Sequence, residues 1–258
     1  MLQFFKYQGT GNDFIMVDDR ERTFPVSQKY IEHLCHRRFG IGADGLILLQ
    51  NADDYDFRMV YFNADGNEGS MCGNGGRCTV RFAQDLRVFN DRTTFLAVDG
   101  PHEATANLEE VSLKMMDVEA VATDGNALFL NTGSPHYVTF VGDVKATDVV
   151  GIGRAIRYGD TYGPKGGTNV NFVEIIDAQT LRVRTYERGV EDETYSCGTG
   201  VTACALAACI RLGMPSPVRV LTEGGTLGVS FETDGITFTN IHLIGPAVKV
   251  FEGKYGGK

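Results

Sequence analysis

Two short segments of this chain carry residues suited to proton transfer. The first is NADGNEGSMCGNGGRC, with Cys72, and the second is DETYSCGTGVTAC, with Cys197. Each cysteine stands directly before a Gly-x-Gly run at the predicted beginning of a helix. The positive end of a helix dipole favours a thiolate and lowers the pKa of the thiol. The glycines also leave backbone N–H groups open to an anion such as a carboxylate. The pattern predicts two reactive thiols, each beside an anion site.

The elements that must position the two thiols repeat along the chain. Tyr61 and Tyr186 stand at the same distance before Cys72 and Cys197, and each strand leads through an acidic, turn-rich loop into C-G-x-G. Earlier in each half, TGNDFIMV and TGSPHYVTF share Thr-Gly and then a strand. Motifs that recur in one order indicate two related halves. We predict the halves at residues 1–115 and 116–247, with a last strand in residues 248–258 returning to the first half.

Short β-branched and aromatic segments bounded by Gly, Asn and Asp predict many strands and few helices. One helix is expected within residues 26–39, where Ser27 is a candidate cap and Ile31, Leu34 and Cys35 form an apolar stripe. The others follow the two cysteines. The helix after Cys197 is apolar on nearly every face, which is typical of a helix buried all round. We therefore predict an α+β fold of two pseudo-symmetric domains, each a mixed or antiparallel barrel-like sheet around a central helix.

The composition limits which binding partners and which cellular compartment are expected. The chain has 24 Lys and Arg against 33 Asp and Glu, a net charge of −9. An acidic protein is a poor non-specific binder of nucleic acid or anionic membranes. No signal-like apolar segment opens the chain, and no apolar run approaches the ~18 residues that cross a bilayer. Six cysteines are too few for a disulfide scaffold in a chain of this length. We expect a cytoplasmic protein with reduced thiols.

Other readings of the same motifs are weaker. GIGADG at residues 40–45 and GTGVTA at residues 198–203 match dinucleotide-binding patterns. The first has a helix before it instead of a strand, and the second follows an acidic loop that would repel a pyrophosphate. The cysteine spacings do not match a structural zinc site, so no metal is expected. A lone cysteine is most often an inert core residue. That interpretation suits four of the six: Cys35, Cys78, Cys204 and Cys209.

Two thiols at converging helix ends suit inversion of a carbon next to a carboxylate. One thiolate removes the α-proton, and the other thiol delivers a proton to the opposite face. The N–H groups of both helix ends stabilise the charge that develops on the carboxylate oxygens. The chemistry formally requires no cofactor.

A set of motifs makes the chain resemble the diaminopimelate epimerases nearly end to end. The motifs are GNDF, FNADG, CGNG-R, G-PH, YERG and CGTG. The resemblance implies interconversion of LL- and meso-2,6-diaminopimelate without pyridoxal phosphate, for lysine and peptidoglycan synthesis. It also implies two similar αβ domains and a homodimer.

By position in these motifs, Cys72 and Cys197 resemble the catalytic acid–base pair. The resemblance makes His136 the partner of the first thiol and Glu187 that of the second. Arg188 would clamp the distal carboxylate. The other substrate-binding residues that it implies are Asn12, Asn63, Gly73, Asn74, Asn169, Glu187, Gly198 and Thr199.

The sequence departs from the usual family pattern in three places. Ser134 stands where Asn is frequent, which predicts a shorter or water-mediated hydrogen bond to substrate. Gly45 stands where some members have a side-chain amide, so it contributes backbone at best. The loop ERGVEDETYSCG is one residue longer than usual, which leaves the placement of Glu187 relative to Cys197 open.

Two further functions remain alternatives at this point. A proline racemase-like or phenazine-pathway-like isomerase would lack a cation at the far end of its pocket. A non-enzymatic thiol or metal-binding module would hold stoichiometric zinc and show no isomerase activity.

Overall fold

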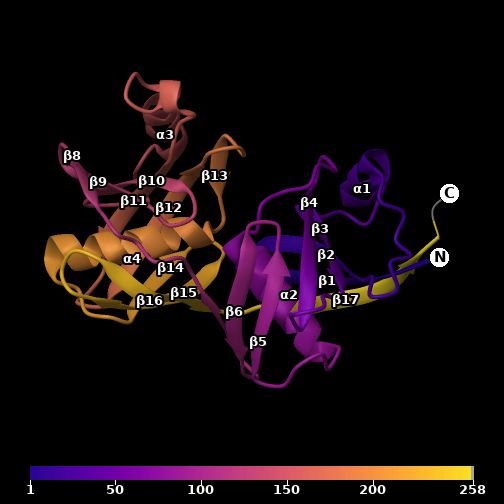
Figure 1. Cartoon of the computed structure of the whole chain (residues 1–258). Coiled ribbons are helices and arrows are strands. Elements are labelled where there is room, and N and C mark those ends of the chain that lie inside the picture. The colour runs from indigo at the N-terminus through magenta and orange to yellow at the C-terminus, as the bar shows by residue number, and fades with distance from the viewer. Residues whose placement is uncertain (257–258) are drawn as a thin grey trace. The chain divides into compact units, whose positions relative to one another are not determined.

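The computed structural model describes residues 1–256, which divide into two compact units. The first, unit 1, holds residues 1–113 and the segment that begins at Gly245, and the second, unit 2, holds Lys114–Ile244 (Figure 1). Both combine helices with mixed sheets, so the predicted α+β class is confirmed. Among the described residues, no helix is long and apolar enough to span a bilayer.

Unit 1 is a mixed sheet with two main helices. β17 pairs antiparallel with β1, and β1 pairs antiparallel with β2. Parallel pairs join β2 to β3 and β4 to β5, while antiparallel pairs join β3 to β4, β5 to β6 and β6 to β7. Each parallel pair is bridged by a helix, as a crossover requires. The elements are β1 (Leu2–Gly9), β2 (Asn12–Asp18), α1 (Gln28–Cys35), β3 (Gly45–Gln50), β4 (Phe57–Asn63), α2 (Gly73–Asp85), β5 (Arg92–Ala97), β6 (Gly100–Ala106), β7 (Val111–Lys114) and β17 (Val248–Tyr255).

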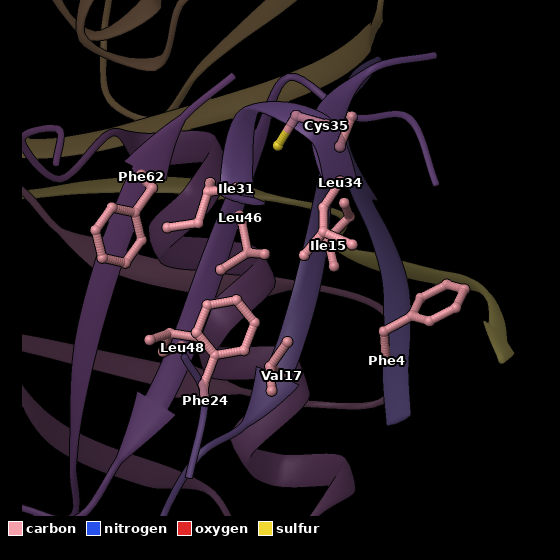
Figure 2. Packing of buried hydrophobic residues seen from close by; sticks show 11 residues of the cluster. Phe4, Ile15, Val17, Phe24, Ile31, Leu34, Cys35, Leu46, Leu48 and Phe62 are labelled. Carbon is pink, nitrogen blue, oxygen red and sulfur yellow. The ribbon is translucent and has the colours of Figure 1, made fainter. Parts of the chain in front are cut away.

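The two helices cover opposite faces of the β1–β4 sheet. Figure 2 shows Ile31 and Leu34 of α1 packed against side chains of β2 and β3, such as Ile15 and Leu46. On the other face, Ile47 of β3 approaches the first turn of α2. Because side chains alternate across a strand, every residue of β3 is buried, as in sheets covered on both sides. The predicted apolar stripe of α1 is confirmed, although Ser27 at its N-cap makes no side-chain cap hydrogen bond.

Unit 2 follows the same order of strands and crossovers. Antiparallel pairs join β8 to β9, β9 to β10, β11 to β12, β12 to β13, β14 to β15 and β15 to β16. Parallel pairs join β10 to β11 across α3 and β12 to β14 across α4. The elements are β8 (Ala122–Asp124), β9 (Ala127–Asn131), β10 (Pro135–Phe140), α3 (Val149–Tyr158), a short 3₁₀ turn η1 (Gly163–Lys165), β11 (Asn169–Ile175), β12 (Thr180–Glu187), β13 (Asp192–Thr194), α4 (Gly198–Leu212), β14 (Val218–Thr222), β15 (Gly225–Thr233) and β16 (Phe238–Gly245).

The helices of unit 2 also lie on opposite faces of their sheet. Val149 and Ile156 of α3 pack with Val170, Phe172 and Tyr186 of β11 and β12. The alternate residues of the same strands therefore point toward α4. Helix α4 is buried from Gly198 to Ala208 except at Thr199, and α2 is buried from Gly73 to Ala83. Each unit therefore has a central helix buried on all sides, and each central helix begins directly after a candidate cysteine.

Candidate functional site

Cys72 is the N-cap of α2, and its sulfur caps the helix. The residue has an extended backbone with φ −116° and ψ 149°, and its Sγ accepts a hydrogen bond from the N–H of Gly75 at 3.2 Å. Side-chain acceptors at this position satisfy the exposed N–H groups of the first turn. A donor aimed at the sulfur favours the thiolate, and so does the helix dipole. The half-buried thiol therefore has surroundings that suit the acid–base role predicted for it.

The buried side chain of Arg77 binds the first turn of α2, and this residue was not predicted from the sequence. Arg77 is fully buried, and its guanidinium donates to the carbonyl of Gly73 at 3.2 Å and to Oδ1 of Asn74 at 3.0 Å. Burial lowers the pKa of Arg77 to about 10, and the described residues give it no carboxylate partner. Gly73 and Asn74, both predicted to bind carboxylate, are fixed by this side chain. The CGNG-R motif contained the signal, since an arginine four residues after Gly73 lies over the first turn.

Asn12 begins β2 and Asn63 ends β4, the two strands that flank β3 in unit 1. Asn12 is half-buried and donates to Oδ2 of Asp44 at 2.7 Å. Asn63 is exposed, and its register partner across the β3–β4 ladder is Gly45. A Cβ on Gly45 would lie 2.5 Å from the ring of Tyr61, so that ring excludes a side chain there. Gly45 can contribute only backbone, as the sequence predicted.

Cys197 is the N-cap of α4 and has a different partner from Cys72. Its backbone is extended, with φ −113° and ψ 111°, but its side chain makes no cap hydrogen bond to the helix. Its Sγ lies 3.5 Å from the hydroxyl oxygen of Thr199 instead. The residue is buried, with 7% of its surface exposed. The first turn of α4 is anchored at Thr199, whose carbonyl accepts from the hydroxyl of Thr132 at 2.8 Å.

His136 is fully buried, and both of its ring nitrogens are engaged within unit 2. Nε2 lies 2.9 Å from the hydroxyl of Thr199, and Nδ1 lies 3.2 Å from the side-chain nitrogen of Asn171. Burial, followed by the positive charge of Arg188, lowers the pKa of His136 to about 3, so the imidazole is neutral. Its hydrogen bonds lead toward Cys197 through Thr199. The predicted partnership with Cys72 stays a prediction and would require Thr199 to release Nε2.

Asn169 and Ser134 hold the backbone of the loop that carries Arg188. Oδ1 of Asn169 accepts from the N–H of Arg188 at 2.8 Å, and its amide donates to Oγ of Ser134 at 2.9 Å and to the carbonyl of Pro135 at 3.0 Å. Both amide hydrogens of Asn169 are thus used inside the protein, which leaves an oxygen lone pair and the exposed Arg188 side chain for a ligand. Ser134 serves as an acceptor within this arrangement.

Glu187 and the longer loop are fixed by carboxylate contacts. Oε2 of Glu187 accepts from the hydroxyl of Thr194 at 2.8 Å. Glu191, at a left-handed φ of 60°, accepts from Arg157 of α3 at 3.0 Å and from the hydroxyl of Tyr186 at 3.1 Å. The turn after Arg188 is therefore tied to α3, a helix whose presence the sequence did not predict.

The remaining cysteines have the features of core residues. Burial raises the pKa of Cys35 and of Cys78 to about 12, and it also raises the pKa of Cys204 and of Cys209. GIGADG lies between α1 and β3, the helix-then-strand context that does not suit a dinucleotide.

The predicted site residues divide between the two units. Unit 1 holds Asn12, Asn63, Cys72, Gly73 and Asn74, and unit 2 holds His136, Asn169, Glu187, Arg188, Cys197, Gly198 and Thr199. Some of them meet at the first turn of the buried helix: Cys72, Gly73 and Asn74 at α2, and Cys197, Gly198 and Thr199 with His136 at α4. Asn169 and Arg188 contact each other through the N–H of Arg188. Each first turn offers a thiol, backbone N–H groups and an amide or hydroxyl.

Comparison with known proteins gives one consistent family. A family profile described as diaminopimelate epimerase matches residues 4–121 and 128–250. A diaminopimelate epimerase of Flavobacterium psychrophilum is 52% identical over 97% of this chain and 99% of its own length. A diaminopimelate epimerase of Aquifex aeolicus is 40% identical over 98% of this chain and 97% of its own.

Solved structures share the fold at low identity. A Bacillus anthracis phenazine biosynthesis protein of the PhzF family matches with a TM-score of 0.74 and 14% identity, and the match covers 98% of both chains. A probable proline racemase of Agrobacterium radiobacter matches with a TM-score of 0.68 and 15% identity over 99% of this chain and 93% of its own. These matches show the fold alone.

Proposed function

This chain belongs to the diaminopimelate epimerase family, a family of isomerases, and we propose that Cys72 and Cys197 carry out its reaction. That reaction interconverts LL- and meso-2,6-diaminopimelate, an inversion at one α-carbon. The observation that carries the assignment of residues is that each buried central helix begins with a cysteine N-cap.

Inversion needs a base on one face of the α-carbon and an acid on the other. A thiolate at one cysteine takes the α-proton, and the thiol of the other cysteine supplies a proton to the opposite face. As the proton leaves, charge grows on the carboxylate oxygens. Backbone N–H groups at a helix N-terminus stabilise such charge without reorganising, and we assign this role to Gly73, Asn74 and Gly198, together with Thr199. The reaction uses no cofactor.

The side chains around each thiol have supporting roles. His136 and Glu187 set the protonation of the thiols. Arg188 is exposed, so its guanidinium is available to a second carboxylate, which it can bind through two parallel hydrogen bonds. Asn12 and Asn63 contribute side-chain amides to the substrate, and Asn169 contributes its side-chain carbonyl oxygen. A substrate with two amino-carboxylate centres offers one carboxylate to the backbone N–H groups of the helix starts and a second carboxylate to Arg188.

The enzyme works as a homodimer in the cytoplasm. β17 pairs with β1 on one side, and its Val248, Val250 and Phe251 are exposed. Apolar groups on the outermost strand favour contact with a second copy. Six cysteines in a chain of this length are too few for a disulfide scaffold, which fits a reducing compartment. The two-base mechanism requires both thiols at one carbon, where they could oxidise to a disulfide, so it predicts that activity depends on a reductant.

The test is incubation of LL-diaminopimelate with the pure enzyme in D₂O. Formation of meso product with deuterium at the α-carbon is the expected result. Absence of both would refute the function. Cys72→Ala and Cys197→Ala should each abolish turnover, and epimerisation that persists in either variant would rule out the two-base mechanism. Proline turnover without diaminopimelate turnover would instead assign the chain to the proline racemase-like alternative.

A further inference from the structure

A buried line of side chains crosses three strands of unit 2 and ends at Cys197. Asn171 lies on β11, where its register partners are Val138 of β10 and Thr185 of β12. Since Val170 and Phe172 point toward α3, Asn171 points to the other face, toward α4. Asn171 is fully buried, as is His136, and 3% of the surface of Thr185 is exposed. Polar groups buried this deeply are costly unless their hydrogen bonds are satisfied.

The contacts of Asn171 fix which way its amide points. Its side-chain nitrogen lies 3.0 Å from the carbonyl of Tyr137, an oxygen that can only accept. Its Oδ1 lies 2.9 Å from the hydroxyl of Thr185, which donates to it. Exchanging the oxygen and the nitrogen would set two carbonyl oxygens against each other, so the amide has one orientation. The second amide hydrogen then points to Nδ1 of His136, at 3.2 Å.

This orientation determines the tautomer of the histidine. Because the amide donates to Nδ1, that nitrogen carries a lone pair, and the neutral ring holds its hydrogen on Nε2. Nε2–H therefore donates to the hydroxyl oxygen of Thr199 at 2.9 Å. With its oxygen accepting from the ring, Thr199 has its own hydrogen free for the sulfur of Cys197 at 3.5 Å.

We propose that Asn171, held by Thr185, is a positioning residue that fixes the tautomer of His136 and, through Thr199, directs a hydroxyl hydrogen at the sulfur of Cys197. The inference deepens the proposed function, on which its catalytic meaning rests. We call the series Thr185, Asn171, His136 and Thr199 the relay. It stabilises a thiolate at Cys197 through the hydroxyl of Thr199, a neutral donor, whereas the sulfur of Cys72 accepts from the backbone N–H of Gly75. The low pKa of His136 agrees with a neutral ring in this relay.

The first turn of α4 packs so closely against Asn171 and His136 that no side chain fits at Gly200. A Cβ on Gly200 would lie 2.5 Å from Oδ1 of Asn171 and 3.3 Å from Cε1 of His136. The second glycine of C-G-x-G is therefore required by the side chains that pack on it. It lets the amide and the imidazole approach the first turn of α4.

The first measurement needs no variant and no substrate. Imidazole ¹H–¹⁵N correlation spectra of the full-length protein at neutral pH should show His136 with hydrogen on Nε2 and a lone pair on Nδ1. The opposite tautomer, or an imidazolium, would overturn the proposal. Because the spectrum does not depend on turnover, failure of the relay is distinguishable from failure of the epimerase assignment.

The second measurement compares the two thiols within one molecule. In Asn171→Asp a carboxylate replaces the amide donor, so Nδ1 carries the hydrogen. In the neutral ring, which the same ¹H–¹⁵N spectra identify, Thr199 then donates to Nε2 instead of to sulfur. Alkylation of Cys197, followed by mass spectrometry of its peptide, should slow about tenfold or more, since a hydrogen bond to a charged group changes an equilibrium by at least that factor. Alkylation of Cys72 should stay within about twofold, and kcat should fall more than KM rises.

Thr185→Val tests the same relay with less disturbance if Asn171→Asp does not fold. It removes only the hydroxyl that holds Oδ1 of Asn171, and the same direction of change is expected at Cys197 alone. Thr139→Val is the control, because Thr139 lies on β10 opposite Phe172, whose side chain packs with α3, so Thr139 is on the face away from Asn171. An unchanged ratio of Cys197 to Cys72 alkylation in Thr185→Val would overturn the proposal, as would an equal loss in Thr139→Val.

Discussion

Gly200→Ala should lower both stability and turnover, although alanine is the better helix former. The added Cβ would lie 2.5 Å from Oδ1 of Asn171, closer than any real Cβ contact. Overpacking of this kind costs about 1–3 kcal/mol. Replacing glycine by alanine in a helix returns at most about 1 kcal/mol. We expect a net loss of about 1–2 kcal/mol, which lowers the thermal midpoint by about 2–8 °C in a chain of this size.

The same clash should affect catalysis more than stability. To accept the methyl group, Asn171 must move by about 1 Å, which breaks its contact with Thr185 or with His136. A displacement of that size near a reacting group typically costs on the order of 100-fold in rate. The assays are differential scanning calorimetry and steady-state epimerisation.

Two other glycine variants serve as controls. Gly75→Ala is the matched change in α2, where the nearest atom to the new Cβ is the sulfur of Cys72 at 3.1 Å, so its stability should change by less than about 1 kcal/mol. Gly142→Ala has no neighbour within 4 Å and should be inert. A Gly200→Ala enzyme with an unchanged or higher midpoint and full activity would refute the packing argument.

Three further predictions follow from the site and from the outermost strand. Arg188→Ala should raise KM for diaminopimelate by about tenfold or more, since a charge-assisted pair is lost, and unchanged KM would exclude Arg188 as the clamp. If the proposed dimer forms through β17, light scattering should show a dimer for the wild type and a monomer for Phe251→Asp, and a dimer that persists in the variant would place the interface elsewhere. His136→Gln should make the free energy of unfolding depend less on pH below about pH 6.5. The pKa of His136 is about 3 in the native state and ordinarily 6.5 when unfolded, so below pH 6.5 only the unfolded state takes up the proton. The wild type therefore loses up to about 1.4 kcal/mol per pH unit as the pH falls from 6.5 toward 3, and denaturant titrations of both proteins at pH 7 and pH 5 should differ by about 2 kcal/mol. Equal losses would show that His136 titrates normally.

Local patterns were sufficient to predict most strands and both central helices. The continuous apolar character of residues 198–212 predicted a fully buried helix, and α4 is one. Helix α3 was not predicted because Gly151 and Gly153 are poor helix formers and interrupt its apolar pattern. A Cβ on Gly153 would lie 2.5 Å from the Cβ of Tyr186. Glycine is therefore required at this position by packing against β12, which is distant in the sequence. Asp148, which caps the helix by accepting from the N–H of Gly151, was the available local signal.

The site was predictable where one segment contains all the chemistry. The C-G-x-G segments place a thiol and bare N–H groups together without help from the rest of the chain. The relay behind Cys197 was not predictable in this way, because it depends on the register of β10, β11 and β12. The alternation in NVNFV did carry a hint, since Asn171 shares its strand face with Asn169. Only the pairing of Asn171 with Thr185 shows what that amide does.

The repeated halves support their thiols in different ways, and the reaction itself requires those supports to balance. Asn74 and Thr199 occupy equivalent places after the two cysteines, yet Asn74 is held by the buried cation of Arg77 and Thr199 by a neutral imidazole. In the proposed two-base mechanism, one direction begins with a thiolate at Cys72 and the other with a thiolate at Cys197. If one thiolate were much more stable, the enzyme form with the other would be scarce by a factor of ten for each pKa unit of difference. Thr199→Val removes support on one side only. It should therefore lower kcat/KM, and the decrease must be the same factor in both directions because the ratio of the two kcat/KM values equals the equilibrium constant of the substrates. Unchanged kcat/KM in Thr199→Val would show that its hydroxyl does not support the thiolate of Cys197.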